Sequence, residues 1–369
     1  MPNWCSNRMY FFGEPAKIAE IKRLASGAVT PLYRRATNEG IQLFLAGSAG
    51  LLQTTEDVRF EPCPGLTAAG RGVVSPENIA FTRWLTHLQN GVLLDEQNCL
   101  MLHELWLQSG TGQRRWEGLP DDVRDTITAL FTAKRGDWCG FWSNEDVSVW
   151  WNRLCDNVLP EKTMPFDLLT VLPTRLDVEV NGFNGGVLNG VPSAYHWYTE
   201  QYGVKWPVGY EVNISRQGEN FIQVDFDTPW CQPESDVVAE LSRRFSCTLE
   251  HWYAEQGCNF CGWQRYERGE LVDVLWGELE WSSRTDDDEL PEVTGPAWIV
   301  DNVAHCALWR MKYDGDGRAT ARFFSDKGCR RAPLFTAPAD AARHKRCLWS
   351  VSRVRRARDG RFTAPGWRR

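Results

Sequence analysis

The stretch from residue 221 to residue 263 constrains the fold of this chain more than any other. From 222 to 227, apolar side chains alternate with polar ones, which predicts a β-strand with one buried face. A helical spacing of apolar residues follows at 236–245, and a second strand pattern follows at 248–255. A strand, a crossover helix and a strand make one half of a split βαβ unit. The sequence therefore predicts an α+β protein.

The rest of the chain supplies the other half. Residues 3–13 have the pattern of a strand, and residues 13–27 that of a short helix with Ile18, Ile21 and Leu24 on one face. The apolar run 166–173 is expected to be the next strand. We therefore predict a ferredoxin-like split βαββαβ antiparallel sheet that is interrupted by a helical insertion. The expected domains are 1–27 with 166–265 for the ferredoxin-like sheet, 28–165 for the helical insertion, 266–301 for an acidic linker or exposed strand pair, and 302–369 for a small basic β-hairpin module.

Charge is divided unevenly along the chain. Residues 302–369 hold 17 Lys/Arg and 5 Asp/Glu, a balance of +12. Of the 41 basic and 48 acidic residues in the whole chain, this leaves 24 and 43 for residues 1–301, a balance of −19. An acidic body with a basic tail favours two partners for the tail, either phosphates or its own body, and charge alone does not choose.

The sequence is that of a globular protein, with 43% hydrophobic residues. Its first residues lack the apolar core of a secretion signal, and no apolar run approaches the ~20 residues that span a bilayer. We therefore expect a cytoplasmic protein whose 12 cysteines are reduced, with no membrane partner.

Several short motifs resemble one known family, the YubB-like proteins of conjugative plasmids and phages. The matching pieces are Pro2-Asn-Trp-Cys-Ser-Asn7, Phe166-Asp-Leu-Leu-Thr-Val-Leu-Pro173, Tyr202-Gly-Val-Lys-Trp206, Asp227-Thr-Pro-Trp230, Trp252-Tyr-Ala-Glu-Gln-Gly257 and Cys261-Gly262. The resemblance covers roughly residues 1–303 and does not extend to the basic tail. It implies a ferredoxin-like fold without an iron–sulfur cluster and an accessory role in a mobile element. It implies no particular activity.

Five residues near the ends of the predicted strands are candidates for a binding site. They are Tyr202, Lys205, Trp206, Trp230 and Trp252. Gathered at one end of the sheet, they would form an aromatic-walled recognition pocket with a cation in it. The alternative is that these large side chains only pack the edge of the sheet, with Lys205 extended past Trp206.

Catalytic and metal-binding signatures are weak. Cys258 and Cys261 have the spacing of metal ligands, and His251 is near in sequence, but zinc needs four converging ligands and a second well-spaced cysteine pair is absent. The alternative is a turn with small thiols. We predict no cofactor, no metal and no catalytic residue, and regard a metal or thiol enzyme centred on Cys258 and Cys261 as the weakest hypothesis.

Nucleic-acid binding is favoured by the tail and not by the sheet. On the 221–229 strand we expect Gln223, Asp225 and Asp227 to be exposed, where they would repel phosphate. The tail instead interleaves aromatic residues with seven cations, at Arg343, Lys345, Arg346, Arg353, Arg355, Arg356 and Arg358. Neutralising several phosphates with such residues gives salt-dependent binding with little sequence preference.

The leading hypothesis is a non-enzymatic binding protein of a mobile genetic element. It would occupy a host or plasmid macromolecule as an anti-defence or establishment factor, for example by mimicking nucleic acid through its acidic body. The alternative is a direct nucleic-acid binder that uses the basic tail.

Overall fold

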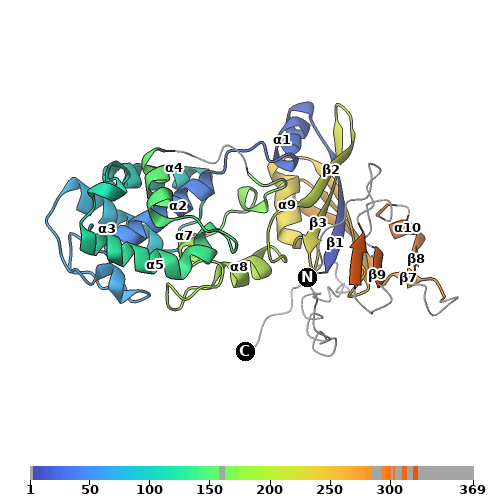
Figure 1. The fold of residues 1–369 in the computed structure, drawn as a ribbon. Coiled ribbons are helices and arrows are strands. Elements are labelled where there is room, and N and C mark those ends of the chain that lie inside the picture. The colour runs from blue at the N-terminus through green and yellow to red at the C-terminus, as the bar shows by residue number, and fades with distance from the viewer. Residues whose placement is uncertain are drawn as a thin grey trace, which may run out of the picture. The chain divides into compact units, whose positions relative to one another are not determined.

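A computed structural model describes residues 3–157, 163–283, 292–300 and 302–303, and the backbone of 310–313 and 319–322 (Figure 1). Residues 2–308 form one compact unit, which holds the main sheet and all the described helices. The segment from 309 onward belongs to a second unit. Each unit is considered by itself.

The main unit contains a six-stranded antiparallel sheet with the order β2-β3-β1-β4-β5-β6. Its strands are β1 (Trp4–Phe12), β2 (Tyr210–Gln217), β3 (Phe221–Pro229), β4 (Thr248–Glu255), β5 (Phe260–Glu267) and β6 (Glu270–Gly277). The first strand lies in the middle, where Met9 is opposite Val224 of β3 and His251 of β4. The order of β1 to β4 is that of a ferredoxin-like domain, so the predicted fold class is confirmed.

Helices α1 (Pro15–Ala25) and α9 (Ser235–Arg244) cover one face of this sheet (Figure 1). Alternate residues of each strand point to this face, and Met9, Val224 and Leu249 are fully buried there against Ile21 and Leu241 of the helices. α1 starts with a proline, which suits a first helical turn, and it is followed by a glycine at φ +69°. The sequence-predicted helix is therefore present.

The long segment between α1 and β2 is helical, and several of its helices gather into one cluster (Figure 1). Its α-helices are α2 (Leu32–Ser48), α3 (Pro76–Gln89), α4 (Glu96–Gln108), α5 (Asp121–Cys139), α6 (Val147–Cys155), α7 (Leu176–Asn181) and α8 (Ala194–Gln201); its 3-10 helices are η1 (Pro64–Thr67), η2 (Thr111–Gln113), η3 (Trp116–Gly118) and η4 (Leu168–Thr170). Side chains of Ser75, Asp95 and Asp146 accept hydrogen bonds from first-turn N–H groups of α3, α4 and α6. Trp84 and Trp150 are fully buried in the cluster. No described helix is long and apolar enough to cross a membrane.

The prediction of a strand at 166–173 is wrong. This run forms the short helix η4, and the second strand of the ferredoxin-like unit is β2, which starts at Tyr210. Asp167 accepts a hydrogen bond from the N–H of Leu169 at 3.1 Å, which favours a tight turn. Phe166, Leu168 and Leu169 are all buried, and a short apolar run that is buried on every side has no period that distinguishes a strand from a helix.

The sheet also extends further than the sequence predicted. β5 forms a hairpin with β4, and β6 adds a sixth strand from within the segment 266–301, which was expected to be a linker or an exposed strand pair. The same segment contains a two-stranded sheet of β7 (Glu280–Trp281) and β8 (Val293–Gly295), followed by α10 (Ala297–Val300).

The second face of the sheet is buried and polar near its centre, contrary to our expectation for β3. Gln223, Asp225 and Asp227 are between 2% and 8% exposed. Arg8 of β1 forms a two-pronged ion pair with Asp225, with Nε–Oδ1 at 2.7 Å and Nη2–Oδ2 at 3.1 Å. Arg8 also donates to the carbonyl of Asn302, beside a small apolar cluster that includes Ile299. The polar residues of β3 are therefore used for internal contacts.

The described part of the second unit is a short antiparallel pair of β9 (Arg310–Tyr313) and β10 (Ala319–Arg322). It falls within 302–369, the segment expected to form a small basic β-hairpin module, and residues 323–369 of that segment lie outside the described residues.

Candidate functional site

Lys205 lies among three aromatic rings. Its Nζ is 4.5 Å from the ring centre of Trp206, 5.4 Å from that of Trp230 and 5.9 Å from that of Phe183. A cation at such distances is attracted by the electron-rich ring faces. The structure thus brings three of the five sequence-predicted site residues together and adds Phe183.

Separate segments of the chain supply these side chains. Lys205 and Trp206 lie in the loop between α8 and β2, and Phe183 follows α7. Trp230 follows β3 directly at φ +76°, and its N–H donates to the carbonyl of Asn3 at 2.8 Å. A left-handed backbone is costly for such a bulky residue, so its position depends on the surrounding contacts.

More aromatic rings extend the cluster in two directions. Tyr195 of α8 meets Trp230 edge to face at 6.3 Å, and on the other side Trp206 contacts Tyr210, which contacts Trp4 at 4.8 Å. We call these residues the aromatic strip; it comprises Trp4, Phe183, Tyr195, Lys205, Trp206, Tyr210 and Trp230. Every member is partly exposed. Sequence reasoning missed four of them, and only Tyr210, which starts a weak period-two pattern, had a local signal.

Lys205 has no ion pair or hydrogen bond with any of the described residues. Its ammonium group has three donors, which the ring faces attract without accepting full hydrogen bonds. A partly exposed cation of this kind can bind a carboxylate or a carbonyl oxygen while the rings bury apolar groups beside it.

Two of the predicted site residues lie elsewhere. Tyr202 is fully buried, its hydroxyl donates to the carbonyl of Leu172 at 2.6 Å, and burial raises its pKa well above the usual range. Trp252 is on the second face of the sheet, where its ring lies 5.4 Å from Trp263 and 6.4 Å from Trp298. Both therefore serve packing in separate places.

The weak metal candidates do not converge. His251 points to the face covered by the helices, where its Nε2 is 2.9 Å from Oδ1 of Asn7 and burial lowers its pKa to about 3. Cys261 points to the other face, and burial raises the pKa of its thiol to about 11, which disfavours a reactive thiolate. Cys258 is exposed. Within the described residues, no three His, Cys, Asp or Glu side chains are grouped as a metal site requires.

Two carboxyl groups near η4 and α7, those of the buried Asp167 and the half-buried Glu179, have raised pKa values because removal from solvent disfavours their ionised form. Asp167 accepts a hydrogen bond from the hydroxyl of Tyr33 at 2.6 Å. Glu179 accepts from the hydroxyls of Tyr198 at 2.7 Å and Thr174 at 2.8 Å. These bonds join α2, α7, α8 and the η4 turn, and such full pairing is typical of a structural network.

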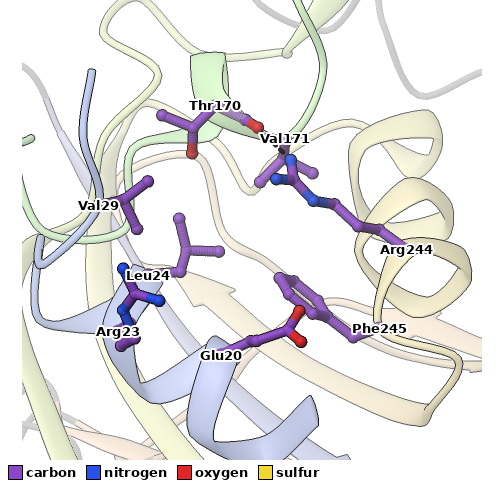
Figure 2. A pocket seen from close by; sticks show the side chains of 8 residues that line it. All are labelled: Glu20, Arg23, Leu24, Val29, Thr170, Val171, Arg244 and Phe245. Atoms are coloured by element: carbon purple, nitrogen blue, oxygen red, sulfur yellow. Dashed lines mark hydrogen bonds between the residues drawn. The ribbon is translucent and has the colours of Figure 1, made fainter. Parts of the chain in front are cut away.

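A pocket of about 180 Å³ lies between α1, α9 and η4, and Figure 2 shows the side chains that line it. Its charged groups already have partners: Arg244 donates to the carbonyl of Thr170, Arg23 to that of Ala28 at 3.3 Å, and Glu20 pairs with Lys17 at 2.9 Å. Because these charged groups are already paired, the aromatic strip is the better candidate site. The seven basic tail residues, from Arg343 to Arg358, lie outside the described residues.

The fold and the strip together define a class, an α+β protein with a ferredoxin-like sheet, a helical insertion and an aromatic surface. Residues 30–206 match a family described as a protein of unknown function (DUF1281), and residues 209–293 match the ferredoxin-like domain in Api92-like protein. The crystal structure of api92 from Yersinia pseudotuberculosis is similar, with a TM-score of 0.71 and 33% identity over 77% of this chain and 100% of that chain.

Two relatives from Escherichia coli K12 are much closer in sequence. YubA is 93% identical over 162 residues, which are 44% of this chain and 96% of YubA. YubB is 92% identical over 142 residues, which are 38% of this chain and 98% of YubB. The chain belongs to the YubB-like, DUF1281 family.

Proposed function

We propose that this chain is a non-enzymatic binding protein that recognises another macromolecule through the aromatic strip. The observation that carries the proposal is Lys205, which lies between partly exposed aromatic rings and forms no ion pair with the described residues. Tryptophan and tyrosine in a half-buried cluster are typical of energetic centres in protein interfaces, and Lys205 adds a charge that can select the partner.

A protein partner that presents a carboxylate to Lys205 fits this surface best. The strip contains one cation, whereas a nucleic acid presents a row of phosphates. Residues 1–301 carry a balance of −19, which repels such a polyanion. A single acidic side chain beside apolar ones satisfies both the cation and the rings.

The family resemblance adds a context to this proposal. We place the protein in the cytoplasm, as an accessory protein of a plasmid or phage that occupies a host or plasmid macromolecule. An anti-defence or establishment role is the form of this function that we propose.

Capture from host lysate on the immobilised protein tests the role of the strip. The Trp206→Ser variant removes a central ring, and the Lys205→Met variant removes the charge at nearly constant size. The matched control is Trp142→Ser, which removes a ring that is 85% exposed and lies outside the strip. We expect a saturable partner that the wild type and the control retain and both strip variants lose. Equal retention by all four proteins, or no saturable partner, would contradict the proposal.

A second candidate is nucleic-acid binding by the tail, which the +12 balance of residues 302–369 favours. Deleting residues 343–369 and measuring DNA and RNA retention at low and high salt tests it. Unchanged retention after the deletion removes the tail from the function.

A further inference from the structure

Strand β6 is an apolar edge of the main sheet. Five of its eight residues are large, apolar and at least 39% exposed, and Trp276 reaches 71%. They are Leu271, Val272, Val274, Leu275 and Trp276. At the opposite edge, β2 exposes polar residues such as Glu211, Asn213 and Arg216, which is the usual protection of an edge strand. β6 has less of that protection, namely the two acids Glu270 and Asp273 and one register shift, at Val272.

Along its outer edge, β6 pairs with none of the described strands, and its one partner among them is β5. The N–H of Val274 donates to the carboxylate of its neighbour Asp273 at 2.9 Å, so it points away from the β5 ladder, and an added strand would replace this carboxylate as the acceptor. An antiparallel ladder alternates inward and outward groups, so the backbone of Trp276 has the same outward direction. A strand that presents outward N–H and C=O groups beside apolar side chains is a template for another strand.

The charge of this segment selects the kind of partner. Residues 269–283 include the four acids Glu270, Asp273, Glu278 and Glu280 and no lysine or arginine. Pairing β6 with the β6 of a second copy brings the two acids of each strand, Glu270 and Asp273, together, and centring the pair on Val274 puts Glu270 opposite Glu278, which directly follows β6. Like charges directly opposite each other weaken a strand pair, and opposite charges strengthen it. The edge is therefore complementary to a basic strand.

We propose that β6 is a strand-addition site for an extended, apolar segment of another protein that carries lysine or arginine. Backbone hydrogen bonds to the outer edge supply affinity, and the apolar side chains of β6 contact alternate residues of the added strand. The acidic side chains favour an added strand that is positively charged. This site is independent of the aromatic strip and goes beyond the proposed function.

The test uses labelled peptides and the full chain, with binding followed by fluorescence anisotropy. The first probe is an acetylated nonapeptide in which valine alternates with lysine. Its acidic counterpart has glutamate in place of lysine. A third peptide has the basic sequence with alternate backbone nitrogens methylated, so it keeps its charge and cannot complete a ladder. Binding to the wild type should be at least about tenfold tighter for the basic peptide than for either of the others.

Two variants of β6 sharpen the test. Val274→Pro removes an outward N–H and leaves the β5 ladder intact, so it should weaken the basic peptide at least about tenfold, while Val274→Thr, which keeps the N–H, should not. The double variant E270K/D273K should reverse the preference from the basic to the acidic peptide, and it does not depend on the proline being tolerated.

Three results would overturn the proposal. Equal binding of the methylated peptide would show a charge effect without strand addition. Failure of the wild type to bind the basic peptide would remove the site. Concentration-dependent dimerisation in sedimentation velocity that Val274→Pro abolishes would assign the edge to a second copy of this chain.

Discussion

The buried Glu39 gives the sharpest test of the electrostatics of the helical segment. It lies on α2, 3% exposed, with its Oε1 2.8 Å from Nδ1 of His103 and 3.3 Å from Nε of Arg35. Its Oε2 is buried without a hydrogen-bond partner in the described part of the chain. Burial raises the pKa of Glu39 from 4.5 to about 8, and the opposing effect of Arg35 is smaller.

The sign of the pH dependence follows from that direction. Between pH 4.5 and 8 the folded chain keeps a proton on Glu39 and the unfolded chain does not, so the free energy of unfolding falls as the pH rises. At about 1.36 kcal/mol per pKa unit, the shift amounts to roughly 3 kcal/mol at pH 7 and roughly 4 kcal/mol at pH 8, where about half of the folded chains have lost the proton. Glu39→Gln imitates the protonated carboxyl and removes this loss.

Urea unfolding at pH 5, 6, 7 and 8 measures the effect. The variant should match the wild type near pH 5 and exceed its free energy of unfolding by a few kcal/mol at pH 8. The control is Glu104→Gln, an exposed glutamate next to His103 on α4, which should follow the wild type at every pH. Parallel curves for Glu39→Gln and the wild type would refute the reasoning, because they would mean that Arg35 and His103 hold Glu39 ionised.

Further predictions concern the sheet and the strip. The pKa of His251 is lowered to about 3, so the free energy of unfolding of the wild type falls as the pH falls below 6.5. His251→Gln removes this loss and should unfold less readily than the wild type in acid titrations from pH 6.5 to 4. Asp225→Asn breaks the buried pair with Arg8 and should lower the free energy of unfolding by about 3 kcal/mol in urea. Gly262→Ala places a Cβ 2.1 Å from the hydroxyl oxygen of the buried Tyr253 and should cost about 1–3 kcal/mol in the same assay. Lys205→Met should cost only about 0.5–1 kcal/mol, the usual size of an exposed cation–π contact, so that a large loss of partner capture by this variant reports on recognition.

Local pattern predicted the ferredoxin-like sheet because its central strands have one apolar face. Ile222, Val224 and Phe226 are buried in β3, and Ile18, Ile21 and Leu24 are buried on one face of α1, as their spacing predicted. The wrong predictions fall where the local sequence pattern does not show which side chains are buried or against what. In the run 166–173 the apolar residues Phe166, Leu168, Leu169 and Val171 are all buried, and Asp225 of β3 is polar in sequence yet buried in a pair with Arg8, which is 217 residues away.

The site was harder to predict because its parts come from distant segments. Lys205 and Trp206 are adjacent in sequence, and Trp230 follows a predicted strand, so these three were accessible to sequence reasoning. Phe183 and Tyr195 join them only because the loop after α7 and the first turn of α8 lie at the end of β3. For Trp252, the strand was predicted correctly, but pattern alone does not say which face of a strand another segment covers.

The two proposed surfaces lie in different parts of one sheet. The aromatic strip reaches from Tyr210 of the edge strand β2 to Trp4 of the central strand β1, and the strand-addition edge is β6. At about 4.8 Å per strand, β6 is roughly 24 Å from β2 and roughly 14 Å from β1, beyond the range at which substitutions usually couple. The losses of binding free energy caused by Trp206→Ser and Val274→Pro should therefore be additive, and each substitution should weaken the binding of only its own ligand. A single partner that responds to both substitutions would have to cross the whole width of the sheet, whereas two partners that each respond to one would make this protein a bridge between them.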